Sequence, residues 1–266
     1  MLGPRTLVMG VINVTPDSFS DGGSVMDGAR ALDVAQAMEA AGADVIDLGG
    51  ESTRPGAQPV DAADELARVL PALRALAPRL QVPISIDTYK ADVARAALDA
   101  GAVLVNDISA FAYDSAMGPL VAARGVPAIL MHTRGRPQDM YAHADYGDVA
   151  ADVTADLQRR IVQAQEQGVA RDRLLLDPGL GFAKRAQQSL DMLKGLPRLA
   201  DLGLPLVVGP SRKSFLAAAT GPVEPPDREW ATAAAVTAAI LGGAHIVRVH
   251  AVEKMVQVAR VADALR

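Results

Sequence analysis

Short apolar runs that end abruptly in a polar residue recur along this chain, and they constrain its fold more than any other feature. The clearest run is Leu174–Leu176, which is followed by Asp177 and the glycine-rich segment Pro178–Phe182. A short apolar run bounded by turn residues is typical of a parallel strand buried on both faces. A carboxylate at the edge of a core is costly unless it is paired or hydrogen-bonded, so we expect Asp177 to face a ligand. The same pattern occurs in Val8–Asn13, Val45–Asp47, Ile84–Asp87, Val103–Asp107 and Ile246–His250.

Strand patterns alternate with helical patterns along the whole chain. We predict strands at Thr6–Ile12, Val45–Leu48, Pro83–Ile86, Val103–Val105, Ala128–Met131, Leu174–Leu176, Leu204–Val208 and His245–Val249. Helical spacing of apolar residues predicts helices at Ala29–Ala41, Leu66–Leu76, Val93–Ala100, Ala116–Arg124, Val149–Gln167, Ser189–Leu199, Ala231–Leu241 and Val252–Leu265. Pro71 predicts a kink in the second helix or a broken first half.

Eight strand and helix units in 266 residues predict an α/β fold, a single (β/α)8 TIM barrel that forms one domain over residues 1–266. Half of the residues are hydrophobic but only 3% are aromatic, which suits buried parallel strands under alanine-rich helices. A doubly wound sheet is the alternative, but it would scatter the strand-end polar residues away from its single crevice. In a barrel the strand-end polar residues converge on one rim.

Charge and cysteine content exclude several classes of protein. The formal net charge of −5 gives no global attraction to nucleic acid or acidic membranes, so we expect neither as a partner. The chain has no cysteine, which excludes disulfides, a cysteine nucleophile and thiolate-bound metals, and fits a reducing cytoplasm. No apolar stretch approaches the ~18 residues that span a bilayer. We therefore expect a soluble, cytoplasmic protein.

Three polar residues follow neighbouring strands and offer one carboxamide and two carboxylates. Asp87, Asn106 and Asp177 are suited to hydrogen-bond the edge of a flat, nitrogen-rich heterocycle, because a carboxylate accepts paired N–H donors in one plane. The alternative is that each caps the helix that follows, which is weakest for Asp177 because Pro-Gly follows it.

A basic cluster marks the ends of the last two strands. Ser211, Arg212 and Lys213 follow one strand, and Arg248 and His250 lie in and after the next. Cationic groups beside a helix start at this position are typical of the phosphate site of the barrel fold. The alternative is a solvated charged face, which suits Arg248 poorly because it lies between two valines.

Other polar and aromatic residues have two interpretations each. Asn13 offers an oxygen ligand to a Mg²⁺ ion held mainly by substrate phosphates, or it is a turn residue. Glu51 is a base or, as we favour, a loop anchor. Phe19 and Phe182 lie in loops and form a wall against a planar ligand or pack beneath the loops. The remaining histidines lack metal-ligand spacing, and we expect structural or surface roles for His132, His143 and His245.

Several motifs in one order resemble the dihydropteroate synthases, the sulfonamide targets of folate synthesis. The motifs are Asn13–Gly23, Gly50–Gly56, Ile86–Thr88, Asn106–Ile108, Asp177–Phe182, Ser211–Lys213 and Arg248–His250, within a match from about residue 6 to 262. The resemblance implies that a dihydropterin methyl diphosphate condenses with para-aminobenzoate, releasing pyrophosphate, with Mg²⁺ as cofactor and no covalent enzyme intermediate. It also implies sulfonamides as competitive inhibitors and a homodimer, although the last helices suit a monomer's core equally well.

The resemblance assigns roles to residues by position. It implies that Asp87, Asn106, Asp177 and Lys213 hold the pterin, with Ile108, Met131, Phe182 and Gly209 lining its slot. It implies that Thr53, Arg54, Ser211, Arg248 and His250 contact the diphosphate or the loops around it, and that Asn13 helps to bind Mg²⁺. It places para-aminobenzoate against Phe19, Pro55, Lys213 and Ser214, and gives Asp177, Lys213 and Arg248 the catalytic roles.

Three alanines depart from the family pattern. Ala183 and Ala231 stand where glycine is usual, and Ala251 stands where aspartate often follows Val-His. That aspartate is suited to cap the last helix or to steady His250, and we expect lost local stability rather than lost activity. Two other functions compete with the synthase: a pterin-binding methyltransferase barrel, disfavoured by Lys213 and the loop Asp17–Asp21, and a paralogue that binds pterin without turnover.

Overall fold

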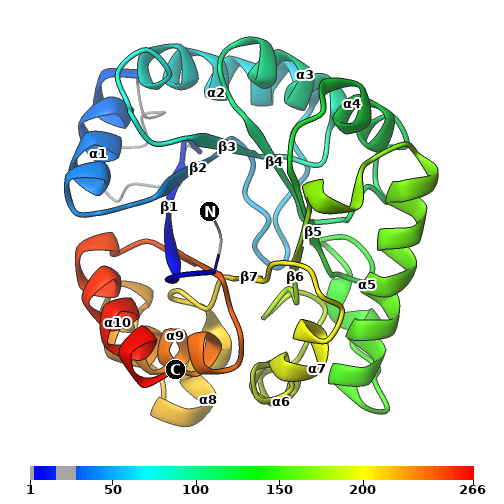
Figure 1. The fold of residues 1–266 in the computed structure, drawn as a ribbon, viewed down its shortest axis with the longest axis vertical. Coiled ribbons are helices and arrows are strands. Elements are labelled where there is room, and N and C mark those ends of the chain that lie inside the picture. Colours follow the sequence, from blue (N-terminus) through cyan, green and yellow to red (C-terminus); the bar gives the residue numbers. More distant parts are fainter. Residues whose placement is uncertain (1–2, 16–27) are drawn as a thin grey trace.

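The computed structural model describes residues 3–15 and 28–266, and it forms a barrel of parallel strands surrounded by helices (Figure 1). The strands are β1 Leu7–Asn13, β2 Val45–Gly49, β3 Ile84–Asp87, β4 Leu104–Asp107, β5 Ala128–Met131, β6 Leu174–Asp177, β7 Val207–Val208 and β8 Ile246–Val249. All pairings are parallel, in the order β6-β5-β4-β3-β2-β1-β8-β7. A single parallel bridge between Leu176 and Leu206 joins β6 to the start of β7 and brings the sheet's two edges together. The predicted α/β barrel is confirmed, and the doubly wound alternative is wrong.

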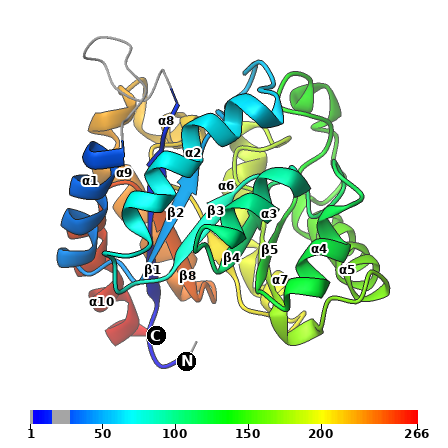
Figure 2. The ribbon, with the colours of Figure 1, turned by 90° about the horizontal axis from the view of Figure 1, so that it is seen from above.

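The helices lie outside the strands, as the alternation predicted. They are α1 Gly28–Ala40, α2 Ala62–Leu76, α3 Ala91–Asp99, α4 Met117–Arg124, α5 Val149–Glu166, α6 Ala186–Lys194, α7 Leu196–Ala200, α8 Ala217–Thr220, α9 Glu229–Leu241 and α10 Val252–Leu265. Figure 2 shows α1 and α10 outside β1. Gly10 of β1 permits this close packing, because a Cβ atom there would lie 2.8 Å from Met38 Sδ of α1 and 3.1 Å from Val252 Cγ2 of α10.

Two predictions about helices are wrong in detail. Of the two outcomes predicted for Pro71, a kink or a broken first half, the break does not occur: α2 is continuous from Ala62 to Leu76. A proline inside a helix costs about 3 kcal/mol, and the buried side chains of Val69, Leu73 and Leu76 on that helix offset the cost. The predicted helix Ser189–Leu199 is instead α6 and α7, which meet at Gly195. That glycine is packed so closely that a Cβ atom would lie 2.4 Å from Ala150 Cβ.

The core has one large layer between strands and helices and a smaller cluster inside the barrel. The inner cluster consists of Met9, Val45, Ile129, Leu175, Val207 and Ile246. A third cluster lies toward the strand ends and contains Tyr89, Ile108 and Met131, with Tyr113 and Phe182 packed against it. Apolar side chains therefore fill the interior up to the level at which the polar strand-end residues begin.

Candidate active site

The polar strand-end residues point into the barrel because side chains alternate along each strand. Leu175 belongs to the inner apolar cluster, so Asp177, two residues further along β6, faces the same interior. The same step leads from Ile246 to Arg248 in β8. A charged layer therefore covers the apolar one at the carboxyl ends of the strands, where barrel enzymes carry their sites.

The guanidinium of Arg248 links the other side chains of this layer to one another. Its Nε donates to Asp47 Oδ2 at 2.6 Å, and its Nη2 donates to Asp87 Oδ2 at 2.7 Å. Asn106 Nδ2 donates to the same Asp47 oxygen at 3.0 Å. Side chains from β2, β3, β4 and β8 thus form one hydrogen-bonded cluster, and the prediction that Arg248 must point to something polar is confirmed.

Asp47 is a member of this cluster to which the sequence interpretation gave no role. Its side chain is fully buried, and its Oδ1 has no hydrogen-bond partner among the described residues. The run Val45–Asp47 showed the strand-end pattern. The two-residue step from Val45, which lies in the inner apolar cluster, is the signal that would have identified Asp47.

Helix capping does not account for the strand-end acids. Asp87 binds Arg248, and the first turn of α3 is capped by another residue, since Ala91 N donates to Asp114 Oδ2 at 2.8 Å. Asp177 Oδ1 accepts from Gly179 N at 2.7 Å and so shapes the turn after β6. The side chains of Asp87 and Asn106 lie in the interior cluster, available to a ligand that enters the barrel.

Burial shifts the pKa values of Asp87, Asp177 and Lys213 away from their usual values. Burial raises the pKa of Asp87 to about 7, with Arg248 opposing this shift and Asp47 adding to it. Burial also raises the pKa of Asp177, against the opposing effect of Lys213. It lowers the pKa of Lys213 to about 8, although Asp177 favours the ammonium. Groups shifted in this way by burial and by specific charged partners are typical of functional sites.

Lys213 lies over the turn that follows β6. Its Nζ donates to Leu180 O and lies 4.7 Å from the centre of the Phe182 ring. Phe182 in turn packs against the cluster of Ile108 and Met131. The structure therefore brings together four of the residues predicted for the pterin slot, and they form an apolar wall topped by a cation.

The predicted basic cluster is partly assembled at the adjacent rim. Ser211 Oγ lies 2.9 Å from His250 Nδ1 and accepts from His250 N at 3.2 Å. Burial lowers the pKa of His250 to about 3, and nearby Arg212, Arg248 and Arg54 contribute to this shift. Arg212 also pairs with Glu229 through Nε at 2.6 Å, so it is held in place and is not part of a freely solvated face. Positive charge from three segments of the chain thus surrounds one imidazole.

Asn13 ends β1 close to Asp87. A Cβ atom added to Gly49 would lie 3.3 Å from Asn13 Oδ1 and 3.5 Å from Asp87 Cβ, so glycine leaves room between them. No group of three or more histidine or acidic side chains in residues 3–15 and 28–266 could hold a metal ion. This donor set fits a Mg²⁺ ion only if its other ligands come from a phosphate group and water.

The remaining predicted site residues lie around the rim. Gly209 faces Arg248, because a Cβ atom there would lie 3.6 Å from Arg248 Cβ. The loop after β2 carries Thr53, Arg54 and Pro55, and Gly56 N of that loop donates to Pro137 O in the loop after β5 at 2.9 Å. Ser214 is exposed beside Lys213, and Phe19 lies outside the described residues.

The interpretation of Glu51 as an anchor agrees with its contacts. Its Oε1 accepts from Tyr89 Oη at 2.9 Å and from Val60 N at 3.2 Å, which ties its loop to the segment that follows β3. The histidines also have structural surroundings: His132 is buried, His245 Nδ1 accepts from Leu206 N at 3.2 Å, and half of the His143 side chain is exposed.

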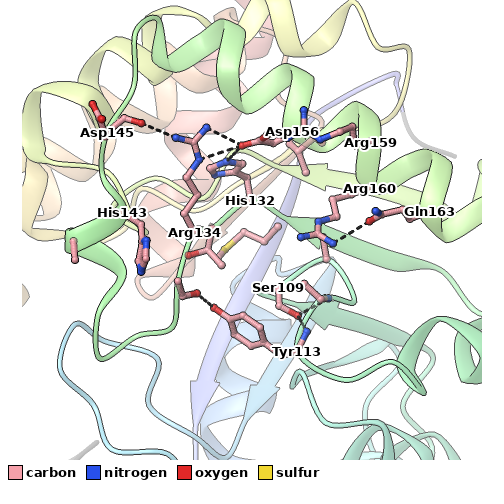
Figure 3. A pocket seen from close by; sticks show the side chains of 17 residues that line it. Ser109, Tyr113, His132, Arg134, His143, Asp145, Asp156, Arg159, Arg160 and Gln163 are labelled. Atoms are coloured by element: carbon pink, nitrogen blue, oxygen red, sulfur yellow. Dashed lines mark hydrogen bonds and ion pairs between the residues drawn. The ribbon is translucent and has the colours of Figure 1, made fainter.

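A cavity of about 680 Å³ lies beside the strand-end layer, between the loops after β4 and β5 and helix α5 (Figure 3). Arg134, Asp156 and Arg160 are among the polar residues that line it. Of the described residues predicted to contact substrate, Met131 alone contributes to this lining. None of the charged cluster around Arg248 lines the cavity, which adjoins the apolar wall through Met131 and Tyr113.

The three departures from the family pattern have distinct structural settings. Ala183 is fully buried at φ +48°, a left-handed conformation that favours glycine. Ala231 lies inside α9, where alanine is a better helix former than glycine. Ala251 is the N-cap residue of α10 and makes no side-chain capping bond, and the expected loss of local stability stays a prediction.

No helix among the described residues combines the length and apolar character needed to cross a membrane. Eight parallel strands carrying a charged layer at their carboxyl ends define the class of this protein as an enzyme of the (β/α)8 barrel type.

A family model described as "Pterin binding enzyme" matches residues 9–250. The chain belongs to this family and, within it, to the dihydropteroate synthases, which are transferases of folate synthesis.

The chain is 48% identical over 263 residues to dihydropteroate synthase of Synechocystis, covering 99% of this chain and 91% of the relative. The Yersinia pestis dihydropteroate synthase solved with a sulfonamide drug is 42% identical, with a TM-score of 0.93, over 98% of this chain and 94% of that one. The Xanthomonas albilineans enzyme solved with 4-aminobenzoic acid is 41% identical, with a TM-score of 0.92, over 98% and 93% of the two chains. The family resemblance is confirmed, and the methyltransferase alternative is not supported.

Proposed function

We propose that this chain condenses (7,8-dihydropterin-6-yl)methyl diphosphate with 4-aminobenzoate to give 7,8-dihydropteroate and pyrophosphate. The observation that carries the proposal is the interior cluster, in which acceptors from several strands surround Arg248 next to an apolar wall and a basic rim. Such a site matches a flat heterocycle with N–H donors at one edge and an anionic group at the other.

The pterin lies deepest in this proposal. Asp87 and Asp177 accept hydrogen bonds from its ring N–H groups, and Asn106 offers both a donor and an acceptor. Ile108, Met131 and Phe182 line the faces of the ring, since they form the apolar cluster at the same level.

The diphosphate faces the rim. Arg248, His250 and Ser211 contact it, with Thr53 and Arg54 closing over it from the loop after β2. The Arg248 guanidinium and the N–H donor of the neutral His250 imidazole stabilise the negative charge that grows on a leaving pyrophosphate. Asn13 would contribute an oxygen ligand to a Mg²⁺ ion, and the ion, when bound, would neutralise phosphate charge.

The residues fit a reaction without a covalent enzyme intermediate. When the diphosphate leaves first, the pterin methylene becomes cationic, and the Asp177 carboxylate stabilises it. The neutral amine of 4-aminobenzoate then attacks the methylene carbon and loses its proton. Lys213, Ser214, Pro55 and Phe19 bound this second substrate, and the sulfonamide complex of the Yersinia relative supports sulfonamides as competitors at the same place.

A homodimer and a cytoplasmic location complete the proposal. Large apolar side chains are exposed on α9 and α10, with Trp230 at 88% and Leu265 at 69%, and such surfaces are typical of contacts between subunits. Light scattering that gives the mass of one chain would contradict the dimer. The cytoplasm is proposed because the chain has no cysteine, and cell fractionation tests it.

The decisive experiment measures pyrophosphate release from the dihydropterin methyl diphosphate with Mg²⁺, with and without 4-aminobenzoate. Release that depends on the amine, with dihydropteroate as product, supports the proposal. Tight pterin binding without release would instead identify a binding paralogue.

A further inference from the structure

Lys184 is a buried lysine that the proposed reaction does not use. Only 1% of the residue is exposed, and its Nζ lies 2.8 Å from His132 Nδ1, 3.1 Å from Gly179 O and 3.1 Å from Phe182 O. A lysine ammonium has three N–H donors and no acceptor, so these three neighbours match its full hydrogen-bonding capacity. The geometry favours the charged form, although burial lowers the pKa of Lys184 well below its usual value.

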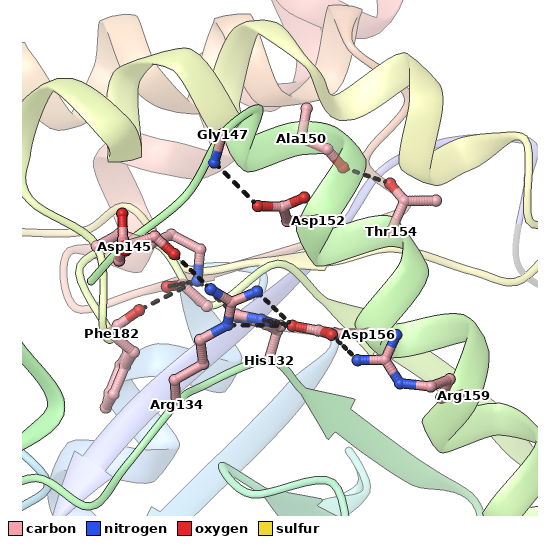
Figure 4. Close-up of polar contacts among 12 residues, drawn as sticks. His132, Arg134, Asp145, Gly147, Ala150, Asp152, Thr154, Asp156, Arg159 and Phe182 are labelled. Carbon is pink, nitrogen blue, oxygen red and sulfur yellow. Dashed lines mark hydrogen bonds and ion pairs between the residues drawn. The ribbon is translucent and has the colours of Figure 1, made fainter. Parts of the chain in front are cut away.

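A second charged group orients the imidazole that faces Lys184. His132 Nε2 lies 3.0 Å from Asp156 Oδ2, so the proton is on Nε2 and the lone pair of Nδ1 faces the ammonium. Burial lowers the pKa of His132 to about 3 and keeps the ring neutral. Asp156 also accepts from Arg134 Nη2 at 3.0 Å and pairs with Arg159 (Figure 4). A series of contacts thus runs inward from α5: the carboxylate of Asp156, bound by guanidinium groups, contacts the neutral imidazole of His132, which contacts the ammonium of Lys184.

The inner end of this series holds the turn of residues 178–182. Gly179 and Phe182, whose carbonyls accept from Lys184, lie in that turn. The turn makes three contacts of the site: Gly179 N donates to Asp177, Leu180 O accepts from Lys213, and the Phe182 ring lies beneath Lys213 Nζ. It also packs tightly on β5, since a Cβ atom on Gly179 would lie 2.0 Å from His132 O.

We propose that Lys184 is a positioning residue: its ammonium, oriented by His132 and Asp156, fixes the turn of residues 178–182 and thereby sets Asp177 and Lys213 toward the substrates. The proposal rests on the proposed condensation, because that reaction is its readout. Lys184 itself touches no substrate, so its effect must pass through the turn.

The first test compares Lys184→Met with Lys194→Met. Both variants keep most of the aliphatic chain and lose the ammonium, but Lys194 lies exposed on α6 and pairs only with Asp191 at 3.1 Å among the described contacts. We expect Lys184→Met to lower kcat/KM for the pterin diphosphate about tenfold or more, as misplaced groups do, and Lys194→Met to leave it unchanged. Equal values for the two variants would overturn the proposal.

A double-mutant cycle that combines Lys184→Met with Lys213→Met distinguishes loss of the positioning of Lys213 from a general loss of structure. When Lys184 acts by placing Lys213, Lys184→Met costs much less in the Lys213→Met background than in the wild-type enzyme. The same fold loss in both backgrounds would show that Lys184 does not act through Lys213, and would overturn the proposal.

If Lys184→Met does not fold, variants of His132 test whether the contact between Lys184 and His132 positions the turn. His132→Asn keeps an acceptor near the position of Nδ1, whereas His132→Leu removes it. We expect kcat/KM to fall further for the leucine variant, and equal activities would contradict the role of the contact with Lys184. A wild-type enzyme that forms no dihydropteroate would overturn the proposed function and this inference with it. An active wild type with no difference between the matched variants overturns the inference alone.

Discussion

Replacing Asp47 with asparagine tests the charge cluster around Arg248. Asparagine keeps the shape of the side chain and an oxygen that accepts from Arg248 Nε, but it removes one negative charge from a fully buried position. Arg248 then serves a single carboxylate, that of Asp87. The variant therefore changes the electrostatics of the cluster while it largely preserves the packing.

The expected effect is a lower pKa of Asp87. In the wild-type enzyme this pKa is about 7, and the charge of Asp47 contributes to its elevation. Because both carboxylates bind one guanidinium, their charges lie roughly 5 Å apart, and at an effective dielectric constant of about 20 they repel each other by about 3 kcal/mol, or about two pH units. Solvent screening reduces this, so we expect the pKa of Asp87 to fall by about one to two units in the variant.

The assay is the pH dependence of kcat/KM for the pterin diphosphate. Asp87 must be ionised to accept N–H donors, so the wild-type value should fall as the pH drops through about 7. In Asp47→Asn this acidic limb should move to lower pH. The alkaline limb is an internal reference, because Asp47 is not among the groups that shift the pKa of Lys213 to about 8, which are Asp177, Arg248 and Asp87 together with burial. An acidic limb that stays in place or moves to higher pH would refute the reasoning.

Three further predictions address other parts of the site and the fold. Asp177→Asn should weaken pterin binding far more than binding of Mg²⁺ or pyrophosphate, and calorimetry showing equal weakening of all three would contradict its role. Phe19→Ala should spare pterin binding yet slow turnover, and unchanged steady-state kinetics would remove the first loop from the mechanism. Ala251→Asp should cap α10, adding about 1 kcal/mol of stability and raising the Tm by about 2–4 °C; a lower Tm would show that this helix end does not accept a cap.

The fold was predictable because the strand-end pattern recurs along the chain and side chains alternate every two residues within a strand. Each short apolar run ends in a polar residue at the same rim, and the two-residue alternation places Asp177 and Arg248 inside the barrel. Short elements were less predictable. The strand predicted at Leu204–Val208 is reduced to Val207–Val208, with Leu206 contributing one bridge, because few backbone groups pair at the point where the barrel closes.

The burial of Lys184 and the partners of Asp47 could not be read from the sequence. Lys184 follows a polar turn and resembles an ordinary loop lysine, and its burial is recognisable only once β5 and the turn supply its three acceptors. Partners distant in sequence have no local signal. Arg248 and Asp47, for example, are 201 positions apart.

The charge distribution along the barrel axis orders the proposed substrates. Asp47, Asp87 and Asp177 lie in strands, deep in the interior, whereas Arg54, Ser211 and His250 follow the strands at the rim. A ligand with N–H donors at one end and a diphosphate at the other has two possible orientations in the barrel. Only the orientation with the N–H donors innermost keeps the diphosphate away from the carboxylates. That orientation brings the reacting methylene between Asp177 and the basic rim, where a developing positive carbon and a departing anion are each stabilised by the nearer group. In the proposed reaction, the layer that fixes the binding direction therefore also favours cleavage of the carbon–oxygen bond.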